Sequence, residues 1–292
     1  MHLLTARDIT DLDQLIALTD QYYQTRAVRP APILADKILA TLFFEPSTRT
    51  RFSFESAMYR LGGQVLSQGG IDSSSLKKGE SLADMGRMMS YYADAIVIRH
   101  PVAGSVDSFA SYASVPVINA GDGASQHPTQ SLVDLYTIYR EANRTKDLKV
   151  GFLGDLKYGR TVHSLAVLLD DPSNTFFFIS PPDLAMPQTD LRATCSHHDI
   201  QACADLLSNL DILYVTRMQV ERLETQSDIP DYWLTRAMIA PYPTVMILHP
   251  LPRKQEIDPE IDSMPNAKYF QQAQYGLYVR MGLLAMMLTS PA

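Results

Sequence analysis

A dense group of hydroxyl and guanidinium side chains lies at 44–51, where the sequence Phe-Glu-Pro-Ser-Thr-Arg-Thr-Arg follows an apolar run and opens a helical pattern. A helix N-terminus presents unpaired backbone N–H groups at the positive end of its dipole, so it attracts anions. The hydroxyls of Ser47, Thr48 and Thr50 would add neutral donors. The forked guanidinium of Arg49 would bind phosphate oxygens. We therefore predict a phosphate site without a glycine-rich loop, the alternative being an ordinary hydroxyl cap beside solvated arginines.

Polar and mostly cationic side chains also follow other apolar runs, at the points where the predicted strands end. After the runs at 95–98, 115–119, 149–153, 211–215 and 245–248 come Arg99, His127 with Gln130, Arg160, Arg217 with Gln219, and the segment 249–253. In open parallel sheets, ligands bind beyond the carboxyl ends of the strands. We therefore predict that each half of the chain binds one small anionic substrate and that the two substrates meet in a cleft.

No side chain stands out as a covalent nucleophile. The chain has no nucleophile elbow and no P-loop, and the segment 151–154 (Gly-Phe-Leu-Gly) is too short for a dinucleotide fingerprint. Direct transfer between two bound substrates is therefore the predicted reaction type. Catalysis would come from juxtaposition of the substrates and from donors directed at a developing oxyanion.

Short β-branched or aromatic runs alternate with amphipathic helical patterns along the chain. Strands are predicted at 38–44, 64–67, 95–98, 115–119, 149–153, 175–179, 211–215 and 245–248. Helices are predicted at 51–61, 81–92, 105–114, 128–141, 161–169, 201–208 and 276–288, after an N-terminal amphipathic helix within 1–20. This alternation predicts the α/β class with parallel sheets. We expect two doubly wound α/β domains joined by interdomain helices, with the active site in the cleft.

The composition restricts the class of protein and its partners. With 292 residues, 46% of them hydrophobic, the chain can form two domains. The net charge of −7 and the lack of a basic tract argue against nucleic-acid binding. No apolar run reaches the roughly 18 residues of a membrane span, and the N-terminus does not resemble a signal peptide. We therefore expect a cytoplasmic protein.

The two cysteines do not indicate a disulfide framework or a metal site. Cys195 and Cys203 lie near His197 and His198, but their spacing matches no standard zinc pattern. We expect a protein that uses neither a metal nor a cofactor.

Eight segments together resemble the aspartate/ornithine carbamoyltransferase family over nearly the full length of the chain, and within it the aspartate-using catalytic chains. They are 44–51 (FEPSTRTR), 74–84 (SSLKKGESLAD), 99–101 (RHP), 119–130 (NAGDGASQHPTQ), 154–164 (GDLKYGRTVHS), 216–222 (TRMQVER), 249–253 (HPLPR) and 269–273 (YFQQA). The resemblance implies that carbamoyl phosphate and L-aspartate give N-carbamoyl-L-aspartate and phosphate, an early step of pyrimidine (UMP) biosynthesis. It implies direct attack through a tetrahedral intermediate.

The resemblance also assigns roles to individual residues. Those assigned to carbamoyl phosphate are Ser47, Thr48, Arg49, Thr50, Ser75, Arg99, His127, Gln130, Pro250 and Leu251. Those assigned to aspartate are Lys78, Arg160, Arg217, Gln219 and Leu251. Those assigned to catalysis are Arg49, Thr50, Lys78, Arg99, His127 and Gln130. Thr50, Arg99 and His127 would donate to the carbonyl oxygen. Gln130 and the backbone of residues 250 and 251 would orient the carbamoyl amide.

The same resemblance implies domains and an assembly. Residues 1–130 with 276–292 would form the carbamoyl phosphate-binding domain, and 131–275 the aspartate-binding domain. Ser75 and Lys78 match a loop that enters the neighbouring subunit's site in the family, which implies a homotrimer with shared active sites. A regulatory chain or a dihydroorotase is a possible further partner.

Two alternative functions are a carbamoyltransferase with another amino-acid acceptor and a homologue without catalytic activity. Ornithine or another amino acid could be the acceptor, but ornithine enzymes typically have His-Cys-Leu-Pro where residues 249–252 are His-Pro-Leu-Pro. They also use an acidic residue with Ser-Met where residues 217–219 are Arg-Met-Gln. A non-catalytic homologue is disfavoured because the cationic and amide residues of the site are intact.

Two features bear on domain closure. The segment 224–240 departs from the family pattern, in a region that forms a mobile loop in the family. Glu45 resembles an interdomain partner of Arg160 and Arg222.

Overall fold

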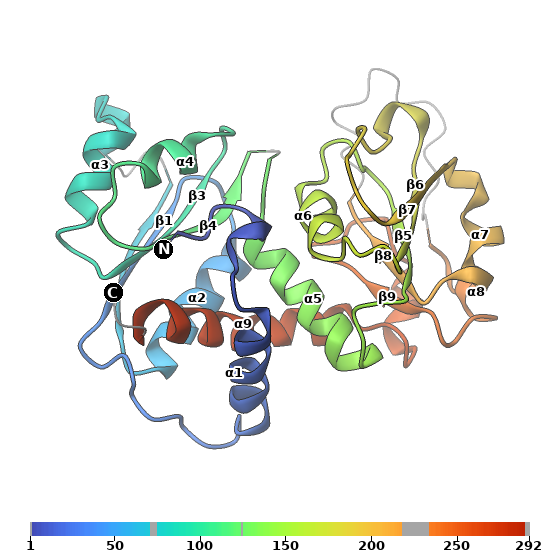
Figure 1. The fold of residues 1–292 in the computed structure, drawn as a ribbon, viewed down its shortest axis with the longest axis horizontal. Coiled ribbons are helices and arrows are strands. Elements are labelled where there is room, and N and C mark those ends of the chain that lie inside the picture. The colour runs from blue at the N-terminus through green and yellow to red at the C-terminus, as the bar shows by residue number, and fades with distance from the viewer. Residues whose placement is uncertain (1, 71–74, 124, 218–233, 290–292) are drawn as a thin grey trace. The chain divides into compact units, whose positions relative to one another are not determined.

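The computed structural model describes residues 2–70, 75–123, 125–217 and 234–289 (Figure 1). The chain forms two compact units, one of Met1–Tyr136 with Gln274–Ala292 and one of Thr137–Ala273. Each unit contains one parallel sheet with helices, so the predicted class of two α/β domains is confirmed. Helices α5 (Pro128–Ala142) and α9 (Tyr269–Thr289) each begin in one unit and end in the other.

The sheet of the first unit has four parallel strands in the order β2-β1-β3-β4. They are β2 (Gln64–Gly69), β1 (Ile38–Phe43), β3 (Ala95–His100) and β4 (Val117–Asp122). Every residue of β3 and β4 is buried, as expected for parallel strands covered on both faces. All four strands were predicted, but β4 continues to Asp122 instead of ending at Asn119.

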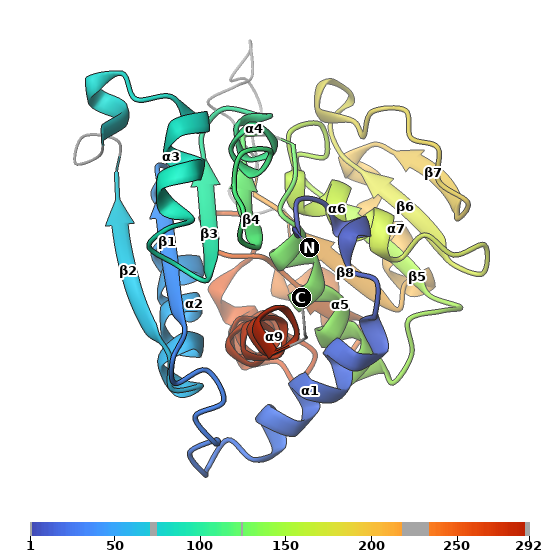
Figure 2. The same cartoon turned by 60° about the vertical axis from the view of Figure 1, so that its left-hand side comes forward.

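Helices cover both faces of this sheet (Figure 2). The unit contains α1 (Leu12–Gln24), α2 (Thr48–Arg60), α3 (Leu82–Met89) and α4 (Ser105–Ala110), with 3-10 turns η1 (Ala6–Asp8) and η3 (Ser75–Lys78). Met85 of α3 and Phe109 of α4 pack in one apolar cluster with Ile96 of β3. Figures 1 and 2 show α2 on the opposite side of the sheet. The unit is therefore wound on both faces.

The two helices at the ends of the first unit differ from their predicted limits. The helix predicted within 1–20 begins only at Leu12, where the Asp11 carboxylate accepts a backbone N–H of the first turn. Leu3 instead forms a parallel bridge with Ile118 of β4. The extended N-terminal segment therefore adds to the sheet edge, which its short apolar pattern did not reveal. Helix α9 starts earlier than predicted, at Tyr269.

The sheet of the second unit has five parallel strands in the order β7-β6-β5-β8-β9. They are β7 (Thr194–His198), β6 (Thr175–Ile179), β5 (Lys149–Leu153), β8 (Ile212–Val215) and β9 (Met246–Leu248). Strand β7 was not predicted from the sequence. Its residues, Thr-Cys-Ser-His-His, form an edge strand with no buried position, so it lacks the apolar run by which the other strands were recognised.

The second unit has short helices and an aromatic core. The helices are α6 (Arg160–Leu168), α7 (Cys203–Leu206) and α8 (Arg236–Ile239), with 3-10 turns η4 (Pro182–Leu184), η5 (Ile200–Ala202), η6 (Leu207–Asn209) and η8 (Pro259–Ser263). Phe152 of β5 contacts the rings of Phe176, Phe178 and Tyr214 on the neighbouring strands. All four rings are almost completely buried. This packing fixes the strands whose carboxyl ends carry the predicted site residues.

Candidate active site

The first turn of α2 carries the predicted phosphate-binding cluster. β1 is buried through Phe43, and a short turn leads directly into α2, which begins at Thr48. Ser47 occupies the N-cap position, but its side chain makes no capping hydrogen bond. The Ser47 hydroxyl therefore does not accept a hydrogen bond from the N–H groups of the first turn. An ordinary hydroxyl cap, the alternative to a phosphate site, would do so.

Arg49 and Thr50 lie in this turn but differ in burial. Thr50 is only 8% exposed, whereas Thr48 and Arg49 are exposed. Partial loss of water nevertheless lowers the pKa of the Arg49 guanidinium. A bound anion would favour the charged form and oppose that shift. The turn is therefore electrostatically suited to an anionic ligand.

Arg99 is held by two contacts at the carboxyl end of β3. Its Nε lies 3.1 Å from Oε2 of Glu45, and its Nη1 donates to the backbone oxygen of Ala120 at 3.3 Å. The residue is 9% exposed, so these contacts restrain a guanidinium that is mostly removed from water. Phe43 is the register partner of Arg99 in β1. Arg99 and the start of α2 therefore lie at the same end of the sheet.

The loop after β3 is tied to the loop after β4. His100 Nδ1 accepts the N–H of Val102 at 3.1 Å, and its backbone oxygen accepts the N–H of Gly123 at 3.0 Å. Asp122 Oδ2 accepts the N–H of Gly104 at 2.8 Å. Burial lowers the pKa of His100. These contacts support a structural role for His100.

His127 and Gln130 lie at the start of α5, which begins at Pro128. His127 is 5% exposed, and its Nδ1 lies 3.4 Å from Oγ1 of Thr129. When this hydroxyl donates to Nδ1, the ring proton lies on Nε2. Gln130 Nε2 donates to Oδ1 of Asp134 at 2.7 Å. Neighbours in the same helix therefore orient both side chains.

Asp134 was not among the predicted site residues. It is completely buried, and it lies four residues after Gln130, on the same face of α5. A glutamine followed four residues later by an aspartate in a predicted helix is the sequence signal that could have indicated the role of Asp134.

In the second unit, the carboxyl ends of β5 and β8 approach closely. Gly154 has φ +128, and a Cβ at this position would lie 2.4 Å from the backbone oxygen of Thr216, so a glycine is required. The buried Asp155 accepts a loop N–H at 2.9 Å and thereby orders the approach to α6. Arg160 is the first residue of α6, and Arg217 follows β8. Both half-buried arginines therefore lie beyond the carboxyl ends of paired strands.

The backbone after β9 has a fixed and unusual conformation. His249 Nδ1 accepts the N–H of Leu251 at 2.8 Å, and the N–H of His249 donates to Gln272 at 2.9 Å. Leu251 has φ +52, a left-handed conformation that costs about 1–3 kcal/mol in a non-glycine residue. Such conformations concentrate at functional sites, which supports the prediction that the backbone of Pro250 and Leu251 contacts substrate.

Several predicted residues lie at or beyond the limits of the described chain. Gln219 and Arg222 lie outside the described residues, as does most of the segment 224–240. Ser75 and Lys78 form the ends of η3, and Lys78 is exposed. The roles of these residues stay predictions.

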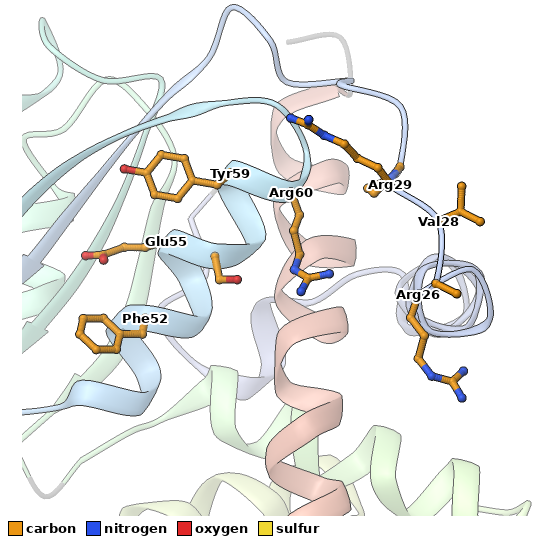
Figure 3. A pocket seen from close by; sticks show the side chains of 10 residues that line it. Arg26, Val28, Arg29, Phe52, Glu55, Tyr59 and Arg60 are labelled. Atoms are coloured by element: carbon orange, nitrogen blue, oxygen red, sulfur yellow. The ribbon is translucent and has the colours of Figure 1, made fainter.

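A cavity of about 670 Å³ in the first unit is not the predicted site (Figure 3). The loop 26–30 and residues 52–60 of α2 line it, so it lies beside the helix and not at its N-terminal turn. Figure 3 shows the guanidiniums of Arg26, Arg29 and Arg60 apart from one another. Their guanidiniums therefore do not converge on one anion.

Neither cysteine forms a disulfide, and burial raises the pKa of the Cys203 thiol to about 12. Within the part of the chain that the structure describes, no group of three or more His, Cys, Asp or Glu side chains could hold a metal ion. Among the same residues, no helix has the length and apolar character needed to cross a membrane.

Two family models match consecutive parts of the chain. The model described as the carbamoyl-P binding domain of aspartate/ornithine carbamoyltransferase matches residues 1–140. The model described as the Asp/Orn binding domain of the same family matches residues 146–287.

Similar proteins of known sequence are aspartate carbamoyltransferase catalytic subunits. That of Methanocaldococcus jannaschii is 45% identical, and the match covers 97% of this chain and 96% of that protein. That of Thermoplasma acidophilum is 46% identical, with coverage of 95% and 94%.

Solved structures show the same similarity. The catalytic subunit of M. jannaschii aspartate transcarbamoylase has a TM-score of 0.89 at 43% identity, and the match covers 98% of this chain and 97% of that chain. Aspartate transcarbamoylase from Trypanosoma cruzi, in complex with carbamoyl phosphate and aspartate, also has a TM-score of 0.89, at 34% identity. That match covers 99% of this chain and 95% of the other.

Proposed function

Because this chain belongs to the aspartate/ornithine carbamoyltransferase family, we propose that it transfers the carbamoyl group of carbamoyl phosphate to the amine of L-aspartate. The products would be N-carbamoyl-L-aspartate and phosphate, an early step of pyrimidine biosynthesis, which we place in the cytoplasm. One observation carries the proposal. The restrained guanidinium of Arg99 lies at the same sheet end as a helix N-terminus whose N-cap hydroxyl makes no capping bond.

We propose that the start of α2 binds the phosphate of carbamoyl phosphate. The first-turn N–H groups and the hydroxyls of Ser47, Thr48 and Thr50 would donate to phosphate oxygens. Arg49 would add a charge-assisted pair, which suits its partly desolvated guanidinium. Ser75 would add a donor from the η3 turn.

Three groups would polarise the carbamoyl carbonyl. Thr50, Arg99 and His127 are each less than 10% exposed. Donors held in such an environment need little reorganisation as charge develops on the oxygen. Glu45 and Ala120 would keep Arg99 in place for this task. The Nε2 proton of His127 would be its donated hydrogen.

In the second unit, Arg160 and Arg217 would bind the aspartate carboxylates, with Gln219 and Lys78 as further donors. This choice of cations also argues for aspartate over ornithine, because the ornithine side chain carries a positive charge that Arg217 would repel. The backbone of Leu251 would contact the reacting groups.

The transfer step needs no covalent enzyme intermediate. The uncharged amine attacks the carbonyl carbon, so a C–N bond forms and the carbonyl electron pair moves to oxygen. The tetrahedral intermediate then collapses and the C–O bond to phosphate breaks. Phosphate leaves with the electron pair of the broken C–O bond and accepts the amine proton, so the reaction needs no dedicated base on the protein.

We also infer a homotrimer with shared active sites. Large apolar side chains are exposed on β2, on α3 and in the turn after α3, namely Leu66, Met88, Tyr91 and Tyr92. Exposed apolar surface of this kind is typical of protein interfaces. A groove of about 420 Å³ between β2 and α3 lies beside several of them. The nearby Lys78 is exposed and would enter the partner's site. A regulatory chain or a dihydroorotase is a possible additional partner.

A carbamoyl-transfer assay tests the proposed function. The purified protein is expected to consume carbamoyl phosphate with aspartate, to show little activity with ornithine, and to keep its activity in the presence of a chelator. Preference for ornithine would refute the substrate assignment, and inactivity with both amines would refute the enzyme class. Sedimentation equilibrium tests the trimer, which a monomeric mass would contradict.

A further inference from the structure

A buried carboxylate and a buried guanidinium lie behind Gln130 in the first unit. Asp134 is 0% exposed and accepts the Gln130 Nε2 hydrogen at 2.7 Å. Arg280 of α9 is 4% exposed, and the charge of Asp134 raises its pKa against the larger effect of burial, which lowers it to about 10. Arg280 therefore stays a cation at neutral pH. Asp134 contacts a predicted substrate-binding amide, that of Gln130.

Arg280 is enclosed by its own helix and by an aromatic ring. Its Nη1 donates to the backbone oxygen of Gly276 at 2.8 Å, and its Cζ lies 5.1 Å from the centre of the Phe54 ring. The Nε of Arg280 is buried without a hydrogen-bond partner among the described residues.

The role of Asp134 follows from the chemistry of the Gln130 amide. The side chain of Gln130 has an acceptor on one side and a donor on the other, and the two can exchange by rotation. An ionised carboxylate only accepts, so Asp134 holds Nε2 of Gln130 toward itself. Oε1 must then face the opposite side. A carbamoyl NH₂ group offers only N–H donors, and Oε1 is the atom that can receive one.

We propose that Asp134 is a positioning residue that fixes the amide of Gln130 with its oxygen toward the carbamoyl group. By accepting the Nε2 hydrogen, the buried Asp134 sets the rotation of Gln130. The inference rests on the proposed function and deepens it, since it names the groups that select an N–H donor over an acceptor in the substrate.

Asp134→Asn is the direct test, because the new amide can donate to Oε1 of Gln130 and stabilise the reversed orientation. We expect kcat/KM for carbamoyl phosphate to fall about 10–100-fold, as for the loss of a hydrogen bond to a charged group. KM for aspartate should change less than twofold. Tyr136→Phe is the matched control, because it removes another partly buried hydrogen bond from a side chain of α5, from Tyr136 to Asp20 at 2.6 Å. That control should lose stability but keep kcat.

A double-mutant cycle separates positioning from general stability. If Asp134 acts through Gln130, Asp134→Asn should cause no further loss of kcat/KM in a Gln130→Ala background. Asp134→Ala, which removes the acceptor, should behave in the same way, and this variant decides the question if Asp134→Asn does not fold. Additive losses, or an unchanged kcat/KM in folded single variants, would overturn the inference. An inactive wild-type protein would instead refute the proposed function.

Discussion

Arg99→Lys is the substitution for which the structure gives the clearest expectation. The guanidinium uses Nε for Glu45 at 3.1 Å and Nη1 for Ala120 at 3.3 Å, and the proposed function requires a further donor for the carbonyl oxygen. A lysine has one ammonium group on a flexible stem, so it cannot maintain these contacts together. The substituted side chain would keep the positive charge, but its charged group would no longer be held in one orientation.

The magnitude follows from which contacts are lost. Removal of one preorganised oxyanion donor typically lowers kcat about 10²–10³-fold, or roughly 2.7–4 kcal/mol in the activation free energy. The free energy of unfolding should change less, because the Glu45 side chain is 32% exposed and water can replace its lost partner. We expect a decrease of about 1 kcal/mol.

The assay is steady-state formation of carbamoyl aspartate, with thermal unfolding measured on the same samples. Arg87→Lys is the matched control, because Arg87 forms a salt bridge of 3.1 Å with Asp84 while both side chains are largely exposed. That control should leave both quantities unchanged. A kcat for Arg99→Lys within threefold of wild type would refute the assignment of Arg99 as an oxyanion donor.

Three further substitutions test the remaining parts of the site. Arg49→Ala should nearly abolish turnover, since each charge-assisted hydrogen bond contributes roughly 1.5–3 kcal/mol, and a near-normal kcat/KM would remove Arg49 from the phosphate site. His127→Ala should reduce kcat about 10²–10³-fold with assembly intact, and a change confined to KM would make His127 a binding residue only. Arg49→Ala and Lys78→Ala proteins, each inactive, should regain activity when mixed and reassembled, because some sites then carry neither substitution. Mixed trimers without activity would contradict shared sites.

The fold was largely predictable because its parallel strands are buried on both faces. Such strands appear as apolar runs, and the runs that became β1, β3, β5 and β8 were all found. The edge strand β7 lacks this signal because solvent covers most of its residues. The N-terminal segment before α1 depends on pairing with the distant Ile118, which no local pattern encodes.

The site residues were predicted from their positions after the strands, but their restraints were not. The pairing of Glu45 with Arg99 joins residues 54 positions apart, so it depends on the register of β1 and β3. The sequence analysis gave Glu45 only an interdomain role, which stays a prediction. The contact between Gln130 and Asp134 is local, and the spacing of four residues could have indicated it.

The discontinuous first unit has a consequence for the order in which the protein folds during synthesis. Its last element, α9, supplies the buried residues Val279, Leu283 and Leu284. A ribosome exports these residues only after the whole segment 137–273 has been made. The first unit therefore lacks a helix until every residue of the second unit has been made. A chain truncated after residue 273 should accordingly protect the second unit from protease and leave the first one open to cleavage.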